Sequence, residues 1–468
     1  DAFDPNSYSV TESFFLSGRY STSKPVALFV ADTTLNDFPG AEVTGAALND
    51  SDLTVKVIDM ITRQPVQNAI VYIGNYNATT AVLTDAAGTA VLHNVTGPVT
   101  LTAVGPAGGS YSYMTIFDLN ASYVVMGLRD FVTSYPEFTL WGDVYGMTTA
   151  NTGAVYVPGT SCYNFNINNY HPTNPGLNEP DPLGTHSVDG LPENYSSQMY
   201  QAAAGVENVV TAFDENGATS DEVFTNFTMN HVAMNPSSGA LQWDLSFPSP
   251  AWQDIWTPIK PSSSPSTVTA PGGHTLDDGD AYLHAFSLEL PTACTPLVGY
   301  GRGTLGAGNA SYTYGLTYAR PSGFETTWYN LKLDGSGTYG AGDAWYSYFC
   351  LGRLIALPSA CDAALPTPPR IQYPTPGAAL SQPPSNLVWN NSFPGKPGVY
   401  HLMITGQGTG TPPPFFAWML VKPTPASGSQ VQVYFPSLPP SHTGPSIGMN
   451  YSLTVSGMNQ QSLSKCAT

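Results

Sequence analysis

Acidic side chains grouped around glycine turns are the residues of this chain best suited to chemistry. Residues 214–222 read Asp-Glu-Asn-Gly-Ala-Thr-Ser-Asp-Glu, and residues 277–280 read Asp-Asp-Gly-Asp. A calcium ion takes roughly six to eight oxygen ligands, which turns of this kind can supply. The two turns therefore predict calcium sites, with solvated turn acids as the alternative. The predicted ligands are Asp214, Asn216, Asp221, Glu222, Asp277, Asp278 and Asp280, and a further acidic group comprises Glu179, Asp181, Asp189 and Glu193.

Two histidines flank the second of these turns. His274 and His284 stand within the same eleven residues as Asp277, Asp278 and Asp280. Zinc and other first-row metals need a cluster of about three or four such ligands. A metal-dependent hydrolase that uses His274, Asp278 and His284 is therefore one hypothesis. A polar surface loop with no metal is the alternative.

Two tryptophans four residues apart suggest a binding platform of another kind. Trp252 and Trp256 lie beside the Ser- and Pro-rich loop at 260–273. Tryptophan combines a large apolar surface with one polar N–H group, which suits stacking against a sugar ring. We therefore expect glycan stacking at Trp252 and Trp256, with ordinary core packing as the alternative.

Motifs for nucleophilic or nucleotide chemistry occur without the elements that they need. Residues 444–448 satisfy GxSxG, but a proline-rich segment precedes Ser446 where a hydrolase requires an apolar strand. Residues 301–306 spell GxGxxG without a helix after them. The five cysteines form no CxxCH, which argues against haem. The sequence therefore predicts a protein that is not an enzyme, with neither haem nor a nucleotide as cofactor.

The cysteines are too few for a disulfide-rich scaffold. Cys350 and Cys361 are close in sequence and form the expected disulfide. The odd number leaves at least one thiol without an intramolecular partner. Cys466 is the candidate for a bond to a neighbouring subunit, and a free thiol is the alternative.

Charge excludes several classes of partner. The chain has a net charge of −19, and the 130 residues between Arg129 and Lys260 contain fourteen acidic residues but no lysine or arginine. Such a chain repels nucleic acids and anionic lipid surfaces. No apolar run reaches the ~20 residues of a membrane-spanning helix. The chain opens at Asp1 without a signal segment, so we expect an exported protein whose signal peptide has been removed.

Composition predicts an all-β, multidomain fold. Only 10% of residues are charged, while the 45 glycines and 42 prolines suit many short strands joined by turns. Serine, threonine and asparagine compete with helical hydrogen bonds, and tyrosine and threonine fit pleated sheets. One helix is expected, at 197–212, where Met199, Ala202 and Val206 recur at helical spacing.

Two segments resemble known β-sandwich modules. Residues 51–128 resemble the carboxypeptidase-regulatory-like family of transthyretin-type sandwiches, and the resemblance implies a fold but no catalysis. Residues 370–468 are similar in architecture to bacterial immunoglobulin or fibronectin type III modules. The first resemblance rests on Asp59, Thr62, Pro65-Val66, Ala69, Val71, Thr84-Asp85, Gly88 and 99–103, and the second on 371–377 followed by Trp389.

These observations predict five regions and a function. We expect a secreted, non-enzymatic structural or adhesive protein, of bacterial type, that self-assembles at the cell surface as a filament, sheath or surface layer. The N-terminal arm would either cover the next domain or add a strand to a neighbouring copy, and the assembly hypothesis uses the second. The alternative is a carbohydrate-binding or glycan-active protein whose site lies in the middle domain. The predicted regions are an arm at 1–50, a sandwich at 51–128, an acidic β-rich domain at 129–358, a proline-rich linker at 359–376 and a sandwich at 377–468.

Overall fold

The computed structural model is all-β, which confirms the predicted fold class. In the part of the chain that it describes, one 3-10 turn, Ala307–Asn309, accompanies the strands. The structure describes residues 28–32, 38–59, 64–131, 137–145, 152–158, 165–170, 193–200, 207–215, 224–233, 240–242, 245–246, 266–286, 297–315, 317–318, 328–339, 343–354, 360–375, 384–392, 398–409, 415–425, 427–446, 449–459 and 466–467.

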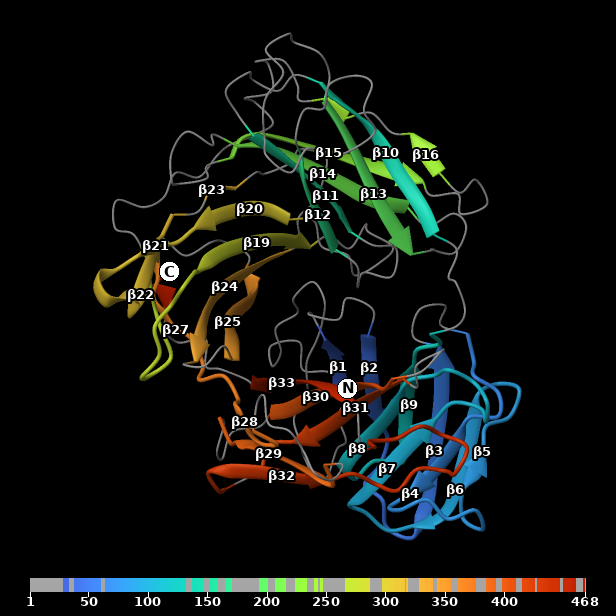
Figure 1. Ribbon diagram of the computed structural model, residues 1–468. Helices are drawn as coiled ribbons and strands as arrows, with labels where there is room; N and C mark the ends of the chain where they lie inside the picture. The colour runs from blue at the N-terminus through green and yellow to red at the C-terminus, as the bar shows by residue number, and fades with distance from the viewer. Residues whose placement is uncertain are drawn as a thin grey trace. The chain divides into compact units, whose positions relative to one another are not determined.

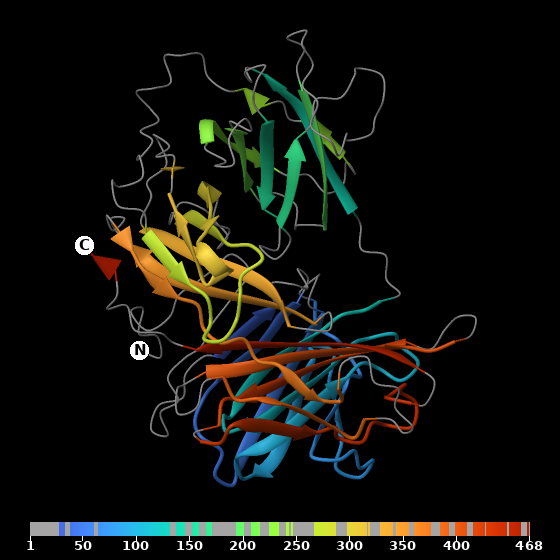
Figure 2. The same cartoon turned by 60° about the vertical axis from the view of Figure 1, so that its left-hand side comes forward.

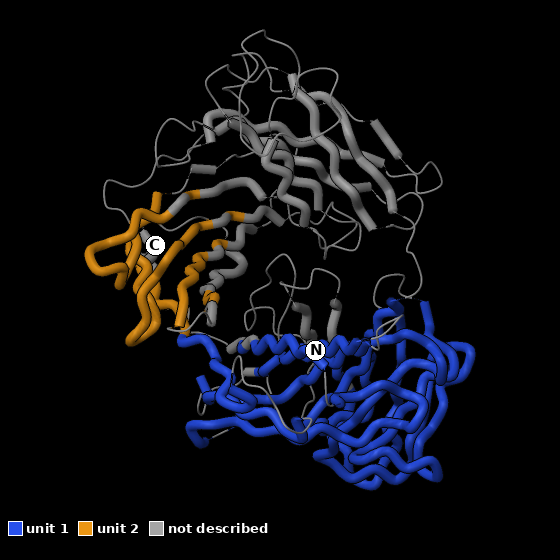
Figure 3. Tube along the Cα trace, viewed as in Figure 1, with its two compact units in different colours: residues 1–8, 14–134, 367–461 blue, residues 9–13, 135–366, 462–468 orange. Residues whose placement is uncertain are grey.

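The chain divides into two compact units (Figure 3). Unit 1 comprises residues 1–8, 14–134 and 367–461, and unit 2 comprises residues 9–13, 135–366 and 462–468. The chain therefore leaves unit 1 after the first predicted sandwich and returns to it within the proline-rich segment. The two predicted sandwich modules consequently belong to one unit, although more than 200 residues separate them in the sequence.

Unit 1 contains a five-stranded sheet that includes the predicted arm. The strand β3 shows the alternating burial of a sheet with one face in the core, with Leu53, Val55 and Val57 fully buried. The arm supplies two strands, and β2 pairs antiparallel with β9 of the same unit. In order, the sheet is β1 (Leu28–Asp32), β2 (Phe38–Thr44), β9 (Tyr123–Leu128), β3 (Ser51–Asp59) and β6 (Thr89–Val95).

A seven-stranded sheet joins the two predicted modules (Figures 1 and 2). The junction is a parallel pairing of β31 with β8, in which Trp418 lies opposite Tyr113 and Val421 opposite Ile116. The order is β33 (Asn450–Asn459), β30 (Gly398–Gln407), β31 (Phe415–Pro423), β8 (Tyr113–Leu119), β7 (Val99–Val104), β4 (Ile70–Ile73) and β5 (Val82–Leu83).

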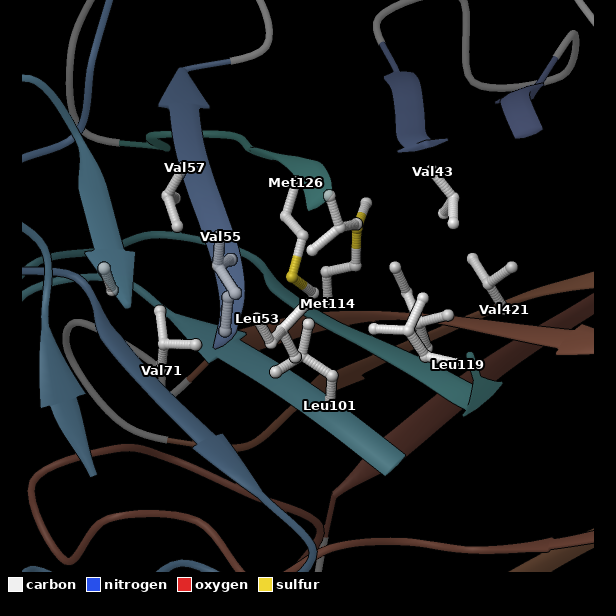
Figure 4. Packing of buried hydrophobic residues seen from close by; sticks show 14 of the residues in the cluster. Val43, Leu53, Val55, Val57, Val71, Leu101, Met114, Leu119, Met126 and Val421 are labelled. Atoms are coloured by element: carbon white, nitrogen blue, oxygen red, sulfur yellow. The ribbon is translucent and has the colours of Figure 1, made fainter. Parts of the chain in front are cut away.

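This seven-stranded sheet buries one face against the five-stranded sheet. Figure 4 shows the packing, in which Leu53 and Met126 of the five-stranded sheet meet Leu101 and Met114 of the seven-stranded sheet. Val421, from the second module, belongs to the same core. Because both modules fill one apolar core, we expect them to unfold together.

The opposite face of the same sheet covers a third, smaller sheet. Its strands are β28 (Ile371–Tyr373), β29 (Asn386–Asn390) and β32 (Gln430–Tyr434). Trp389 of β29 packs against Tyr400 of β30, with the ring centroids 5.4 Å apart. Trp418 lies in this layer and donates its indole N–H to Thr115 Oγ1 at 2.9 Å. Unit 1 is thus a three-layer structure, with the seven-stranded sheet in the middle.

The described residues of unit 2 form five sheets. Their strands include parts of the acidic segment between Arg129 and Lys260, and the pairing is mainly antiparallel. Two sheets come from the acidic segment: β13 (Glu193–Tyr200), β10 (Glu137–Tyr145) and β16 (Ala240–Gln242), with β17 (Leu245–Ser246) also on β10; and β12 (Phe165–Tyr170), β11 (Thr152–Pro158), β14 (Glu207–Glu215) and β15 (Phe224–Ala233). Two more are β21 (Thr304–Leu305), β22 (Ser311–Tyr314), β18 (Ser266–Thr269) and β27 (Ala363–Ala364); and β23 (Thr317–Tyr318), β20 (Leu297–Arg302), β19 (Asp280–Phe286), β24 (Trp328–Tyr339) and β25 (Asp343–Leu354). The last sheet pairs β26 (Ala360–Cys361) with β34 (Cys466–Ala467).

The helix predicted at 197–212 is wrong where the structure describes that segment. Residues 197–200 belong to β13, and residues 207–212 belong to β14. β14 contains adjacent valines at 209 and 210, followed by threonine and, two residues later, Phe213. These β-branched and aromatic residues favour strands, and their pairing with both β11 and β15 overrides the weak helical spacing.

Candidate binding surface

The outer face of the three-stranded sheet presents tyrosine and amide side chains. Tyr434 and Tyr373 are 65% and 42% exposed. Gln432 is also exposed, and Val388 is half-buried beside it, since the two are direct partners in the β29–β32 ladder. We call this surface the tyrosine–amide face; its residues are Gln372, Tyr373, Asn386, Val388, Asn390, Gln430, Gln432 and Tyr434.

Alternation along β32 explains why these residues point outward. The sequence from 430 to 434 reads Gln-Val-Gln-Val-Tyr, and only the two valines are buried. Val431 and Val433 pack in the apolar layer that also contains Trp389, so the register of the strand is set by its inner side. This register places the two glutamines and Tyr434 on the outer face of the sheet.

A register shift in β28 adds to the same surface. Ile371 pairs with Trp389, and Tyr373 pairs with Val388. Between these two pairs the chain moves by two residues on β28 but by only one on β29. An irregularity of this kind leaves one residue outside the ladder and changes the direction of the side chains around it. Gln372 and Tyr373 are accordingly both exposed, although they are neighbours in the chain.

Hydrogen bonds hold several of the outer side chains. Gln430 Nε2 donates to Gln372 Oε1, across the width of the sheet. Gln432 Nε2 donates to the Tyr434 hydroxyl at 3.0 Å. Beneath the face, the Tyr400 hydroxyl donates to Asn391 Oδ1 at 2.8 Å and accepts from the Ser392 backbone N–H at 2.7 Å. These contacts restrict rotation of the side chains, which lowers the entropy lost when the face binds.

The face has a charge that differs from that of the whole chain. None of its eight residues is acidic, whereas the protein has a net charge of −19. Exposed Arg370 is next to it in the chain, and its backbone N–H donates to Asn390 Oδ1. Acidic partners, including another copy of this chain, therefore meet no carboxylate among the residues of this face.

The backbone of the predicted calcium turn at 277–280 is hydrogen-bonded to strand β24. The backbone N–H of Asp277 donates to the Ser336 carbonyl at 2.8 Å, and Asp278 Oδ1 accepts from the Gly279 N–H at 2.9 Å. Asp277 and Asp278 are exposed. Among the side chains that the structure describes, no group of three or more His, Cys, Asp or Glu is placed to hold a metal.

The other predicted site residues lie mostly outside the described residues. Asp214 is in β14, where its backbone pairs with Gly153 and Asn226. Asn216, Asp221 and Glu222 are outside the described residues, as are Trp252 and Trp256, and so is most of the group formed by Glu179, Asp181, Asp189 and Glu193.

His274 packs against two aromatic rings. Its ring centroid is 5.2 Å from that of Tyr339 and 5.5 Å from that of Trp345, in edge contacts. Its Nδ1 is 3.1 Å from the Gly272 carbonyl. His284 lies in β19, with its backbone opposite Leu297 and Asn330. His274 thus has a packing role in the structure.

The cysteines have definite places in the backbone ladders. Cys350, in β25, lies opposite Lys332 of β24. Cys361, in β26, lies opposite Cys466 of β34.

The tyrosine–amide face is not among the sites predicted from the sequence. The signal was present in the alternation of residues 430–434, where two glutamines and a tyrosine share one side of a strand. The exposure of Gln372 was not predictable in the same way, because it depends on the register shift in β28.

Comparison with known proteins finds only distant similarity. No family model matches the chain, and no curated protein matches it. A leucine-rich repeat protein from Bacteroides thetaiotaomicron aligns with 50% of this chain and 26% of its own length, at 9% identity and a TM-score of 0.17. A putative adhesin from Bacteroides ovatus aligns with 50% of this chain and 90% of its own length, at 8% identity and a TM-score of 0.15. The TIE protein of Bacillus anthracis aligns with 68% of this chain and 50% of its own length, at 11% identity and a TM-score of 0.15.

Among the described residues, no helix is long and apolar enough to cross a membrane.

Proposed function

We propose that this chain is a secreted, non-enzymatic cell-surface protein of the structural or adhesive kind, and that copies associate through the tyrosine–amide face. The observation that carries the proposal is this face itself: two exposed tyrosines and several ordered amides on the outer side of a well-packed sheet. Tyrosine is enriched at protein interfaces because its ring is apolar and its hydroxyl still forms a hydrogen bond.

Charge supports association at this face rather than elsewhere. Copies with a net charge of −19 repel each other when acidic surfaces approach. The eight residues of the face contain no carboxylate, so desolvating them requires no burial of an unpaired acid. Amides donate and accept hydrogen bonds, which makes the face complementary to itself. A two-fold contact between copies is the symmetry that uses such a surface on both sides.

A concentration series in the analytical ultracentrifuge tests the proposal. We expect the wild-type chain to self-associate. The double variant Tyr373→Ser/Tyr434→Ser should raise the dissociation constant of this association at least tenfold. Gln432→Glu should also raise it, because a two-fold contact brings the new carboxylates together. Leu83→Ser is the matched control, since Leu83 is 58% exposed on β5 in another sheet of the unit. A wild-type chain that stays monomeric at high concentration contradicts the proposal.

Binding of a neutral polysaccharide is the second candidate function, and the same face favours it. Tyrosine rings on the outer face of a sheet, flanked by amides, suit the apolar faces and hydroxyl groups of sugars. Retention on an insoluble neutral polysaccharide measures this activity. Loss of retention in the double tyrosine variant assigns it to the face. Loss in Trp252→Ala/Trp256→Ala assigns it to the predicted tryptophan platform.

A further inference from the structure

Backbone register brings two cysteines that are distant in sequence to the same position. In the two-stranded antiparallel ladder of β26 and β34, Ala360 pairs with Ala467 and Cys361 pairs with Cys466. Direct partners in antiparallel strands have Cα atoms about 4.5–5.5 Å apart. Disulfides form at Cα separations of about 4.4–6.8 Å. The register therefore meets the backbone requirement for a disulfide.

We propose an intramolecular disulfide between Cys361 and Cys466. The bond competes with the predicted Cys350–Cys361 disulfide, since both use Cys361. The two alternatives differ in what the ladders provide: Cys361 has a cysteine as its direct partner, whereas the direct partner of Cys350 is Lys332. A shift of one residue in the β26–β34 ladder would pair Cys361 with an alanine or a lysine instead.

The length of the ladder shows why a covalent bond would matter here. Each of its strands has two residues, which is fewer than an independently stable pairing needs. Both strands belong to unit 2, but the chain between them enters unit 1 at 367 and leaves it after 461. The disulfide would therefore close a loop that contains all six strands from β28 to β33. Such a bond keeps both ends of this segment attached to unit 2 even when the short ladder opens.

Formation of the bond requires an oxidant. We assign this role to a small-molecule disulfide such as oxidised glutathione. One cysteine thiolate attacks the oxidant, forms a mixed disulfide and releases one equivalent of reduced thiol. The second thiolate then attacks the protein sulfur of the mixed disulfide and releases the second equivalent. Two protein thiols are oxidised to one disulfide, their two protons pass to the two released glutathione thiolates, and one oxidant disulfide is reduced to two thiols.

Peptide mapping of the whole chain tests the proposal directly. The chain is equilibrated with oxidised and reduced glutathione, its free thiols are blocked, and it is digested with trypsin without reduction. Arg353 separates Cys350 from Cys361, so these residues fall in peptides 333–353 and 354–370, and Cys466 begins the peptide after Lys465. We expect mass spectrometry to find peptide 354–370 linked to the peptide that begins at Cys466, and this species to disappear on reduction.

Two variants separate the alternatives. Cys466→Ser should abolish the linked species and leave Cys361 open to alkylation, while Cys350→Ser should keep the link. The proposal is overturned by a link between peptides 333–353 and 354–370, by alkylation of Cys361 in the wild-type chain, or by a Cys466 bond that appears only in dimers on a non-reducing gel. A Cys466→Ser chain that fails to fold leaves the wild-type map as the deciding measurement.

Discussion

Two sheets of unit 1 differ in how many of their faces are buried. The seven-stranded sheet is buried on both faces at its centre, where Trp418 points into one apolar layer and Ala417 into the other. The three-stranded sheet buries Val433 on one side and exposes Gln432 and Tyr434 on the other. A strand with two buried faces leaves no position for surface chemistry. A strand with one free face can change its outer residues without changing its core.

This comparison predicts where the unit tolerates substitution. In β31 the packing residues also connect the two modules, because the strand pairs with β8. In β32 the outer residues contribute to no core cluster.

Trp418→Ala should have the largest effect. The side chain is fully buried, donates a hydrogen bond to Thr115 and makes an edge contact with Tyr113 at 5.9 Å. Removing a buried tryptophan leaves a large cavity, so we expect a loss of about 3–5 kcal/mol in the free energy of unfolding. Denaturant titration followed by circular dichroism measures it. A loss below about 1 kcal/mol would mean that β31 does not join the modules in one cooperative core.

Thr115→Val should have an intermediate effect. Thr115 Oγ1 accepts from the Trp418 indole N–H and lies 2.9 Å from Thr102 Oγ1, in a fully buried position. Valine keeps the shape but leaves the indole N–H without its partner, at a cost of about 1–3 kcal/mol. Thr115→Ser is the control that keeps the hydroxyl and should recover most of this loss in the same titration.

His442 should give unit 1 a smaller dependence on pH. Burial lowers the pKa of His442 from 6.5, with the Gly105 carbonyl opposing this effect at 2.9 Å from Nε2. At a pH between the lowered pKa of His442 in the folded chain and 6.5, the unfolded chain binds more protons than the folded one. Stability should therefore fall as the pH drops below 6.5, and no further once the folded histidine is also protonated. Melting temperatures of wild type and His442→Gln across pH 4–8 test this, and identical profiles would contradict it.

Tyr434→Ser should have the smallest effect on stability. Its side chain is mostly exposed and its hydroxyl accepts one hydrogen bond, from Gln432. Exposed substitutions of this kind usually change the free energy of unfolding by less than about 0.5 kcal/mol. The same titration as for Trp418→Ala measures it. A loss above about 1 kcal/mol would mean that the tyrosine–amide face serves the fold and is not free to serve binding.

The strands themselves were largely predictable from the sequence. Segments such as 99–103, 399–404 and 431–435 are short, rich in β-branched or aromatic residues and bounded by turn residues, and each overlaps a strand in the structure. The prediction of a helix at 197–212 failed because weak helical spacing within one segment carries no information about the strands that pair with that segment. The candidate calcium turn at 214–222 and the tryptophan platform remain predictions, since most of their residues lie beyond the described ranges.

The sequence by itself determined the β class, the strong negative charge and the alternating sides of strands such as β32, because these depend on residue types and on neighbours in the chain. Tertiary structure decided which strands meet: that β31 pairs with β8, that the arm pairs within its own unit and that Cys361 lies opposite Cys466. Pairing between distant strands is selected by the burial of whole sheets against each other. That selection is a property of the assembled layers, and no local window of the sequence contains it.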